Sequence, residues 1–555
     1  MSYVIGLDYG TDSVRAILVN CANGEVVGNS VYTYPRWAKG QYCDPQKNQF
    51  RQHPLDHLEG LRVTLSEVVI SSKINTDQIK GICVDTTGSS PMPVNVKGES
   101  LAMTAGFEEN PNAMMILWKD HTAIKEAAEI TELARTWAGE DFTKYSGGIY
   151  SSEWFWSKIL SVHRKDKAVA AAAFSWVEHC DYITGILTGI DPLSLKRSRC
   201  AAGHKALWHQ DWDGLPPAHF LSILDQSLPA LRENLYVKTF TSNEPAGTIS
   251  KEWAKSLGLS EKTVIAVGTI DAHAGAVGAG IKENTLVKVV GTSTCDMLVA
   301  SDESLGKTLV KGICGQVEGS ILPGFHGLEA GQAGFGDVLA WFVSLILAPS
   351  ISLLNSSEIL DLESKNALIQ EFRDKMIFQL SEDASNLSVV ESKVVSLDWI
   401  NGRRSPDADE SLEGAIIGLN MGTTPAHIFR SLVESLCFGS RRIIDRFEEE
   451  GLQIEEVIAI GGVANKSKLV MQIMADILDR SIKITASTQT PALGAAIYAA
   501  VACGEFPTME EASKAMAPGF DQVYEPNFSN KEFYDKKYKA YQKLGTVVED
   551  FNKRG

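Results

Sequence analysis

The sequence predicts an α/β protein of two domains, and three observations support this. The chain has 555 residues, which is more than one hydrophobic core usually organises. Two similar phrases, VIGLDYGTDSVRA at 4–16 and VKVVGTSTCDML at 287–298, open its two halves. Between and after them, strand-like runs alternate with helix-like runs, as in α/β folds. We therefore expect an N-terminal domain at 1–278 and a C-terminal domain at 279–555.

The first half predicts a strand meander, a helix, a buried strand and an insertion. β-branched residues and turn signals mark the strands, and apolar side chains at helical spacing mark the helix. The expected elements are strands at 4–10, 15–21 and 24–35, a helix at 54–72, a buried strand that ends in a Gly/Ser/Pro loop within 79–96, an insertion of helices at about 110–250, and a strand, a turn and a small-residue helix within 262–280.

The second half restarts the same rhythm. Residues 285–301 predict strand, turn and strand, and residues 455–485 predict strand, Gly-Gly turn, helix and strand. Residues 490–504 are apolar on nearly all sides of a helix, so this helix should be buried. An amphipathic, charged helix is expected after residue 525.

Composition excludes several classes of partner. The formal net charge is −17, which disfavours binding to nucleic acid or to an anionic membrane. Asp8 interrupts the first apolar run before a signal peptide can form, and the apolar stretches at 338–354 and 491–503 are too short for a bilayer span. Nine cysteines without a CxxC pair predict reduced thiols in the cytoplasm.

Both opening phrases predict anion-binding hairpins. In a tight turn between strands, successive backbone N–H groups can point into one concavity and hold a phosphate. Gly10 and Gly291 permit the backbone of such turns. Each hairpin alone is as well explained by a polar turn, but two of them at the starts of two halves favour phosphate binding. The hydroxyl donors that accompany the two turns are Thr11, Ser13, Thr292, Ser293 and Thr294.

Two aspartates accompany these hairpins. Asp8 is tolerable beside a triphosphate only if a cation lies between them, so it is a candidate ligand of a hydrated Mg²⁺; the alternative is an acid that caps its own turn. Asp271 follows a buried strand and precedes a Gly/Ala helix. It suits the base that phosphoryl transfer to an alcohol requires, and a helix N-cap is the alternative.

Together these motifs resemble the FGGY carbohydrate kinases, a branch of the actin-like ATPase superfamily. GLDYGTDSVRA and VVGTST look like the two phosphate motifs of that family, and IGGVANKS looks like its adenosine motif. GTIDAHAGAVGAG looks like the catalytic-base segment, and NGRRSPDADESLEGAIIGL like the C-terminal signature. The match runs from about residue 3 to residue 505. The resemblance implies two ribonuclease-H-like domains, each a mixed five-stranded sheet flanked by helices, with a ligand cleft between them.

The resemblance also implies roles for individual residues. Asp271 would be the general base and, with Asp8, a metal ligand. Residues expected to contact the sugar are Lys205, Glu329, Ser89, Ser90, Met92, Pro93, Trp118, Asp120 and Glu153. Residues expected to bind ATP are Gly10, Thr11, Asp12, Ser13, Arg15, Gly291, Thr292, Ser293, Thr294, Gly336, Gly461, Gly462 and Asn465. A surface lysine at 205 and a helix-capping acid at 329 are the alternatives for those two positions.

The reaction implied is transfer of a phosphoryl group from ATP, with Mg²⁺, to the C5 hydroxyl of L-ribulose. Phrases such as YPRWAKGQYCDPQKNQFRQHP and GGIYSSEWFWSKIL favour this sugar within the family. Two alternatives stay open: a kinase of another pentulose or a polyol, such as xylulose, and a non-catalytic sensor of sugar and ATP. We also expect a homodimer with no nucleic-acid or membrane partner.

Overall fold

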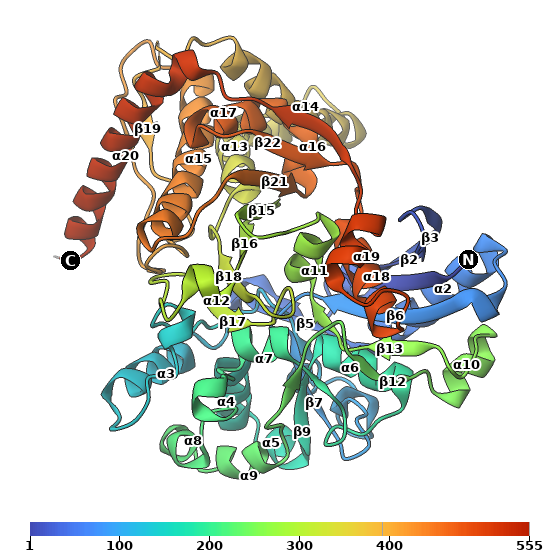
Figure 1. Cartoon of the computed structure of the whole chain (residues 1–555). Coiled ribbons are helices and arrows are strands. Elements are labelled where there is room, and N and C mark those ends of the chain that lie inside the picture. The colour runs from blue at the N-terminus through green and yellow to red at the C-terminus, as the bar shows by residue number, and fades with distance from the viewer. Residues whose placement is uncertain (391, 554–555) are drawn as a thin grey trace.

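The computed structural model describes residues 1–390 and 392–553. Two mixed sheets, one from each half of the chain, form its centre and are flanked by helices (Figure 1). The N-terminal sheet has the order β12-β13-β6-β1-β2-β3, with β14 also paired to β6. These strands are β1 (Tyr3–Tyr9), β2 (Ser13–Asn20), β3 (Val26–Thr33), β6 (Ile79–Thr86), β12 (Pro245–Thr248), β13 (Val264–Ala266) and β14 (Thr269–Ile270).

The C-terminal sheet repeats this plan with the order β17-β18-β16-β15-β21-β22-β23. In each sheet an antiparallel hairpin, β1–β2 or β15–β16, is continued on one side by an antiparallel strand and on the other by parallel strands. The strands are β15 (Thr285–Val290), β16 (Thr294–Ala300), β17 (Gly315–Glu318), β18 (His326–Ala330), β21 (Glu456–Ile460), β22 (Ile482–Thr485) and β23 (Phe520–Tyr524).

Each sheet has seven strands, so the expected count of five is corrected. The five expected strands are present as β3-β2-β1-β6-β13 and β18-β16-β15-β21-β22. The additional strands are short pairings, β12 and β14 on one sheet and β17 and β23 on the other. They form where loops pass a sheet edge or neighbour, which depends on tertiary contacts more than on the local pattern.

A shared hydrophobic core joins the two halves. Helix α18 (Thr490–Ala502) comes from the second half of the chain, yet it packs on β1, β6 and α11 (Asp271–Gly278). The approach is close: a Cβ at Gly6 would lie 1.8 Å from the Ala492 carbonyl oxygen, and one at Gly278 would lie 2.0 Å from the Thr490 carbonyl oxygen. Only glycine permits these contacts. Because α18 packs against elements of both halves, it is buried and apolar on nearly all sides, as expected.

The outer faces of the sheets are covered by longer helices. Helix α2 (Pro54–Ser72) has the bounds predicted from periodicity and packs on β2 and β3. In the C-terminal half, α15 (Pro425–Glu449) packs against α17 (Lys468–Leu478) and α14 (Leu362–Ser385). The predicted C-terminal helix is α20 (Lys531–Asn552), which contacts α15 and α17.

Between β6 and β12 the chain builds a separate, largely helical layer below the N-terminal sheet (Figure 1). Two short strands in it, β7 (Pro91–Val94) and β9 (Ser175–Glu178), pair antiparallel. Its helices are α3 (Ile124–Thr136), α4 (Phe155–Lys165), α5 (Lys167–Ala172), α6 (His179–Thr188), α7 (Arg199–Lys205), α8 (Ala218–Leu224) and α9 (Leu228–Glu233). Helix α7 contacts β14 and β17, so this layer reaches both halves of the molecule.

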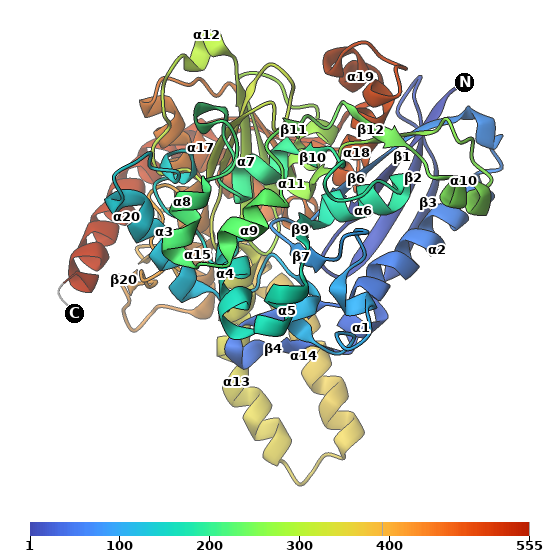
Figure 2. The same ribbon diagram turned by 90° about the horizontal axis from the view of Figure 1, so that it is seen from below.

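A helical hairpin projects from the C-terminal half. Helices α13 (Gly336–Ser356) and α14 run side by side and extend beyond the body of the molecule (Figure 2). The expectation that this apolar stretch is too short for a bilayer is wrong, because α13 continues through Pro349 to 21 residues. Within the described residues it is the one helix long and apolar enough to cross a membrane, by length and composition alone, and 28% of that window is buried.

Candidate functional site

The first hairpin connects β1 and β2 through a turn closed by Gly10, whose N–H donates to the Ser13 carbonyl oxygen at 3.0 Å. Two indole N–H groups already contact the turn. That of Trp118 donates to the Thr11 hydroxyl at 3.0 Å, and that of another tryptophan donates to the Asp12 carboxylate at 2.6 Å. Trp118 therefore lies beside the turn predicted to bind phosphate.

Asp8 is at the end of β1 and is 5% exposed. Its carboxylate accepts a hydrogen bond from Arg15 Nη1 at 3.2 Å, directly across the hairpin. Burial raises the pKa of Asp8, and the guanidinium of Arg15 opposes this shift. Asp8 is therefore a carboxylate inside the strand with one cationic partner, and among the described contacts it accepts no backbone N–H of its own turn.

Asp271 is the first residue of α11 and is half-buried. Ile270 takes the N-cap position, so the alternative N-cap role for Asp271 is wrong; its carboxylate instead accepts the Ala272 N–H at 2.6 Å. Burial first, and then the charge of Asp8, raise the pKa of Asp271 to about 7. A carboxyl group with this pKa can accept a proton near neutral pH.

Lys205 and Glu329 form an ion pair between the two halves of the chain. Lys205 ends α7 and Glu329 lies on β18, and the Nζ atom contacts Oε1 at 2.8 Å and Oε2 at 3.0 Å. Their exposed fractions are 4% and 7%, so Lys205 is no surface lysine and Glu329 caps no helix. Burial opposes both charges, but the pairing outweighs it: the pKa of Lys205 is raised and that of Glu329 is held well below its usual range.

Two buried histidines flank this pair. His204 Nδ1 lies 3.3 Å and His273 Nε2 lies 3.7 Å from Glu329 Oε2. Ligand atoms of His204, His273 and Glu329 lie within 4.8 Å of one another, close enough for a metal ion. The ammonium of Lys205 already neutralises Glu329 at this point, however, and it would repel a second cation. Burial lowers the pKa of His273 to about 4 and keeps it neutral at pH 7.

The loop after β6 is held by Glu178. Ser89 Oγ donates to Glu178 Oε1, and the Ser90 N–H donates to Oε2 at 2.8 Å. Met92 and Pro93 follow on β7 and are buried. These contacts fix the loop as a packed wall between β6 and the helical layer.

Asp120 and Glu153 have partners of their own. Asp120 is fully buried, and its carboxylate contacts Arg51 Nη1 at 3.0 Å and accepts a backbone N–H at 2.7 Å. Glu153 is half-buried and lies 3.4 Å from Arg404 Nη2, which belongs to the second half of the chain. Each of these two acids therefore has a cationic partner of its own.

The second hairpin is tighter than the first. The Gly291 N–H donates to the Ser293 carbonyl oxygen at 3.0 Å. The Thr292 carbonyl oxygen accepts the Phe335 N–H at 2.7 Å, and the Thr294 hydroxyl accepts the Gln332 N–H at 2.9 Å. The start of α13 is thus bound directly to the hairpin.

The Gly-Gly turn reaches the same place. Gly461 has φ of 99°, and a Cβ there would lie 2.7 Å from the Val290 carbonyl oxygen at the end of β15. The Gly336 N–H donates to the Gly291 carbonyl oxygen at 3.0 Å. The second hairpin, the start of α13 and the Gly-Gly turn therefore meet, and their exposed residues include Thr292, Gly462 and Asn465.

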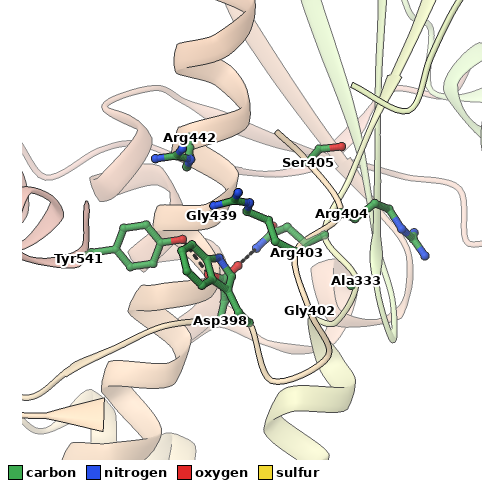
Figure 3. A pocket seen from close by; sticks show the side chains of 11 residues that line it. Ala333, Asp398, Gly402, Arg403, Arg404, Ser405, Gly439, Arg442 and Tyr541 are labelled. Atoms are coloured by element: carbon green, nitrogen blue, oxygen red, sulfur yellow. Dashed lines mark hydrogen bonds between the residues drawn. The ribbon is translucent and has the colours of Figure 1, made fainter. Parts of the chain in front are cut away.

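A small pocket lies beside this region, between the C-terminal signature segment and α15 (Figure 3). Asp398, one of its lining residues, accepts hydrogen bonds from Tyr541 and Gln332, and Arg404 points away from Asp398. Its volume is about 10 Å³, room for about one water. A larger cavity of about 330 Å³ next to it is lined by charged residues such as Arg403 and Glu549. Neither pocket includes Asp8 or Asp271.

One acid in the site was not predicted. Asp85, on β6, is fully buried and lies beside Asp8 and Asp271, whose charges raise its pKa well above the usual range after burial itself. The signal was present in the sequence, because an aspartate within the apolar run IKGICVD is unusual for a buried strand. Only the strand pairing shows that it faces Asp8.

Comparisons with known proteins agree with this arrangement. The N-terminal domain of the FGGY family of carbohydrate kinases matches residues 3–278, and the C-terminal domain of that family matches residues 286–503. The chain is 45% identical over 549 residues to a ribulokinase of Vibrio parahaemolyticus, covering 99% of this chain and 96% of the relative. It is 36% identical to a ribulokinase of Halalkalibacterium halodurans, with 98% and 94% covered.

Solved structures share the fold. A xylulose kinase from Rhodospirillum rubrum superimposes with a TM-score of 0.75 at 20% identity, covering 99% of both chains. A glycerol kinase from Plasmodium falciparum with ADP gives a TM-score of 0.75 at 16% identity, with 99% of this chain and 98% of that chain covered. The α/β class and the actin-like ATPase fold expected from the sequence are confirmed.

Proposed function

The chain belongs to the FGGY family of carbohydrate kinases, and we propose that it phosphorylates L-ribulose at the C5 hydroxyl to give L-ribulose 5-phosphate and ADP. This is a step of L-arabinose catabolism. The observation that carries the proposal is the position of Asp271: the charges of Asp8, Lys205 and Glu329 all act on its carboxyl group. A base, a carboxylate suited to a metal ion and a polar pair suited to hydroxyl groups thus lie together, and two relatives at 45% and 36% identity are ribulokinases.

Asp271 is the proposed general base. Its carboxylate takes the proton of the C5 hydroxyl while the sugar oxygen forms a bond to the γ-phosphorus of ATP. The bond from that phosphorus to the bridging oxygen breaks, and its electron pair leaves with ADP. Most of the rate comes from positioning and from stabilising charge on the transferred group. A non-catalytic sensor would need no base with a pKa of about 7 at this point.

Lys205 and Glu329 are the proposed sugar ligands. A buried ammonium and a buried carboxylate offer a donor and an acceptor for neighbouring hydroxyl groups, and each already satisfies the other before sugar binds. The remaining sugar-facing residues are proposed as the wall of that site. They are Ser89, Ser90, Met92, Pro93, Trp118 and Glu153, with Asp120 as support because its carboxylate is bonded to Arg51.

The two hairpins are the proposed phosphate sites, and the segment from Gly461 to Asn465 is the proposed adenosine site, with Gly336 beside it. Residues Gly10 to Ser13 with Arg15 would contact the phosphates from one side, and Gly291 to Thr294 from the other. The meeting of the second hairpin with Gly336 and Gly461 supports this assignment.

The residues present also fit Mg²⁺. Among the described residues, the buried carboxyl of Asp85 accepts no hydrogen bond from a cation or a backbone N–H, and Arg15 is the one arginine that contacts Asp8, Asp85 or Asp271. A divalent cation would relieve both conditions, and oxygen ligands are those Mg²⁺ prefers. Asp8 and Asp271 are the proposed holders of the ion. When bound, Mg²⁺ neutralises charge on the phosphate groups.

The test is ADP release in the presence of single sugars. We expect release with L-ribulose to exceed that with D-xylulose, D-ribulose, ribitol or glycerol in kcat/KM, and phosphorus NMR of the product to show the phosphate on C5. Higher kcat/KM with another sugar would transfer the assignment to that sugar. ATP turnover that no sugar stimulates would remove the kinase assignment.

We further propose a cytoplasmic homodimer without nucleic-acid partners. The formal net charge of −17 supports the last point, and the cysteines, all free thiols in the described ranges, support a reducing compartment. Size-exclusion chromatography with light scattering measures the oligomeric state, and a monomeric mass would contradict the dimer.

A further inference from the structure

Asp85 differs from every other buried acid in the described part of the chain. It lies near the end of β6 and is fully buried, and neither carboxylate oxygen accepts a hydrogen bond from a cation or a backbone N–H; its neighbour is the carboxyl group of Asp8. The other buried aspartates and glutamates each have at least one cationic or hydrogen-bonding partner. They are Asp8, Asp56, Asp120, Glu126, Glu178, Asp181, Asp296, Glu329, Asp398, Glu434 and Asp476.

Strand register brings Asp85 into the site already described. Asp85 is the direct neighbour of Asp8 on β1 and of Thr269 on β14, and both strands run parallel to β6. Asp271 follows Thr269 by two residues. Because parallel strands end at the same edge of a sheet, the three carboxyl groups gather there. Their mutual proximity is also seen in the charges that act on Asp85, those of Asp8 and Asp271.

Among the described residues, these three acids have too few cationic partners to balance their negative charges. Arg15 donates to Asp8 at 3.2 Å and is the one cation within hydrogen-bonding reach of any of them. Burying a carboxylate without a partner costs several kcal/mol. If Asp85 were protonated, its O–H group could donate a hydrogen bond to Asp8, but its other oxygen would stay without a partner. A hydrated divalent cation supplies both charge and water O–H donors to all of these oxygens.

We propose that Asp85 is a ligand of the Mg²⁺ that accompanies ATP, and that with Asp8 it forms a two-carboxylate site on adjacent strands. The proposal rests on the proposed kinase function for the identity of the ion. One or two carboxylates, with water and phosphate oxygens filling the remaining positions, are the usual protein contribution to a Mg²⁺ site. Asp85 then takes the place of Asp271 as the second carboxylate ligand, and Asp271 is left to act on the sugar hydroxyl.

The decisive variant is Asp85→Asn. Asparagine copies the size and the donor of a neutral aspartic acid, but it cannot carry the negative charge of the carboxylate form. Free Mn²⁺, used in place of Mg²⁺, is measured by electron paramagnetic resonance in the presence of the imido analogue of ATP. We expect the Kd for Mn²⁺ to rise at least about tenfold, while calorimetry gives an L-ribulose Kd close to that of the unaltered protein. An unchanged Mn²⁺ affinity would make Asp85 a neutral structural acid and overturn the proposal.

The matched control is Asp181→Asn, another buried acid, which contacts Arg197 and the Ser198 N–H away from this cluster. It should leave the Mn²⁺ affinity unchanged. If Asp85→Asn does not fold, the unaltered protein decides: in crystals with Mn²⁺ and the ATP analogue, anomalous scattering should place the ion about 2.1 Å from an Asp85 oxygen or one water away. An ion bound to Asp8 but beyond that reach overturns the proposal. Failure of every sugar to stimulate ADP release would instead remove the kinase function and leave the Mn²⁺ result standing.

Discussion

Two groups of buried charge lie close together in the site, and their charges are balanced in opposite ways. The ion-pair group, Lys205 with Glu329, has one positive and one negative charge in contact at 2.8 Å. The acidic group, Asp8, Asp85 and Asp271, has three carboxyl groups and one arginine, at 3.2 Å from Asp8. In the first group the partners lower the free energy of both charges. In the second, the neighbours raise the pKa of Asp85 and Asp271.

The difference indicates what each group can bind. The ion-pair group is complete in the protein alone, so an uncharged ligand with several hydroxyl groups can join its hydrogen bonds without changing the charge. The acidic group is incomplete without a cation, and a cation attracts phosphate. Removing a member should therefore destabilise the first group and stabilise the second, at the expense of function.

The largest effect is expected for Asp271→Asn. The amide keeps the size and much of the hydrogen bonding but cannot accept the hydroxyl proton, so kcat should fall by roughly 10²–10⁴. Calorimetry should show L-ribulose binding largely kept. Steady-state ADP release measures the first quantity. A turnover near that of the unaltered protein would exclude Asp271 as the base.

Next is Lys205→Met, which leaves Glu329 buried without its cation. Loss of one partner of a buried pair costs about 3–5 kcal/mol, and thermal unfolding should show a markedly lower midpoint. Lys375→Met is the control, because Lys375 pairs with Glu371 at 2.6 Å on the exposed surface, where a pair contributes about 0–1 kcal/mol. Equal midpoints for the two variants would mean that the buried Lys205–Glu329 pair stabilises the fold no more than an exposed pair does. The double variant Lys205→Met, Glu329→Gln should recover part of the loss.

Asp8→Ala tests the acidic group from the metal side. The Mg²⁺ concentration at half-maximal rate should rise about tenfold or more, because a ligand is lost, and the L-ribulose Kd should change far less. Activity measured across a Mg²⁺ series at saturating ATP and sugar gives the first value. A variant with the Mg²⁺ dependence of the unaltered protein would show that Asp8 holds no metal.

Much of the fold could be predicted because its signals are local. Hairpins, the helix at 54–72 and the buried helix at 490–504 each follow from the spacing of apolar and turn residues within one segment. The short strands β12, β14 and β23 depend on a neighbour from elsewhere in the chain, and periodicity over a few residues does not specify them. The packing of α18 on the N-terminal sheet is likewise non-local, since it depends on Gly6 and Gly278.

The site divides in the same way. Asp8 and Asp271 stand next to turns and were identified from their local context. Asp85 lies inside an apolar strand, and only the register with β1 gives it a neighbour in the site. The partners of Glu153 and Asp120 could not be foreseen either, because Arg404 is 251 positions away along the chain and Arg51 reaches Asp120 through folding of the insertion.

The pH profile should report the acidic group. A base must be deprotonated to act, and the pKa of Asp271 is about 7, so kcat/KM for L-ribulose should rise with pH and level off above about pH 7. Bound Mg²⁺ favours the charged carboxylate, so kcat should level off at a lower pH than kcat/KM. A kcat/KM that is flat from pH 5 to pH 8 would contradict the raised pKa.

The smallest effect concerns stability, and its sign separates the two groups. The folded-state pKa of Asp271 lies above its ordinary value of 3.8, so the folded protein keeps a proton that the unfolded chain loses. The contribution of this group to stability is therefore present below about pH 4 and is lost as the pH rises toward 7. Asp271→Asn removes that loss. Without Mg²⁺, the midpoint of thermal unfolding of the variant should be close to that of the unaltered protein at pH 4.5. At pH 8 it should be higher by a few degrees, which corresponds to a gain in the free energy of unfolding on the order of 1–3 kcal/mol. An Asp271→Asn protein that melts lower at pH 8 would mean that this carboxylate is stabilised by its surroundings, and the contrast with the ion-pair group would disappear.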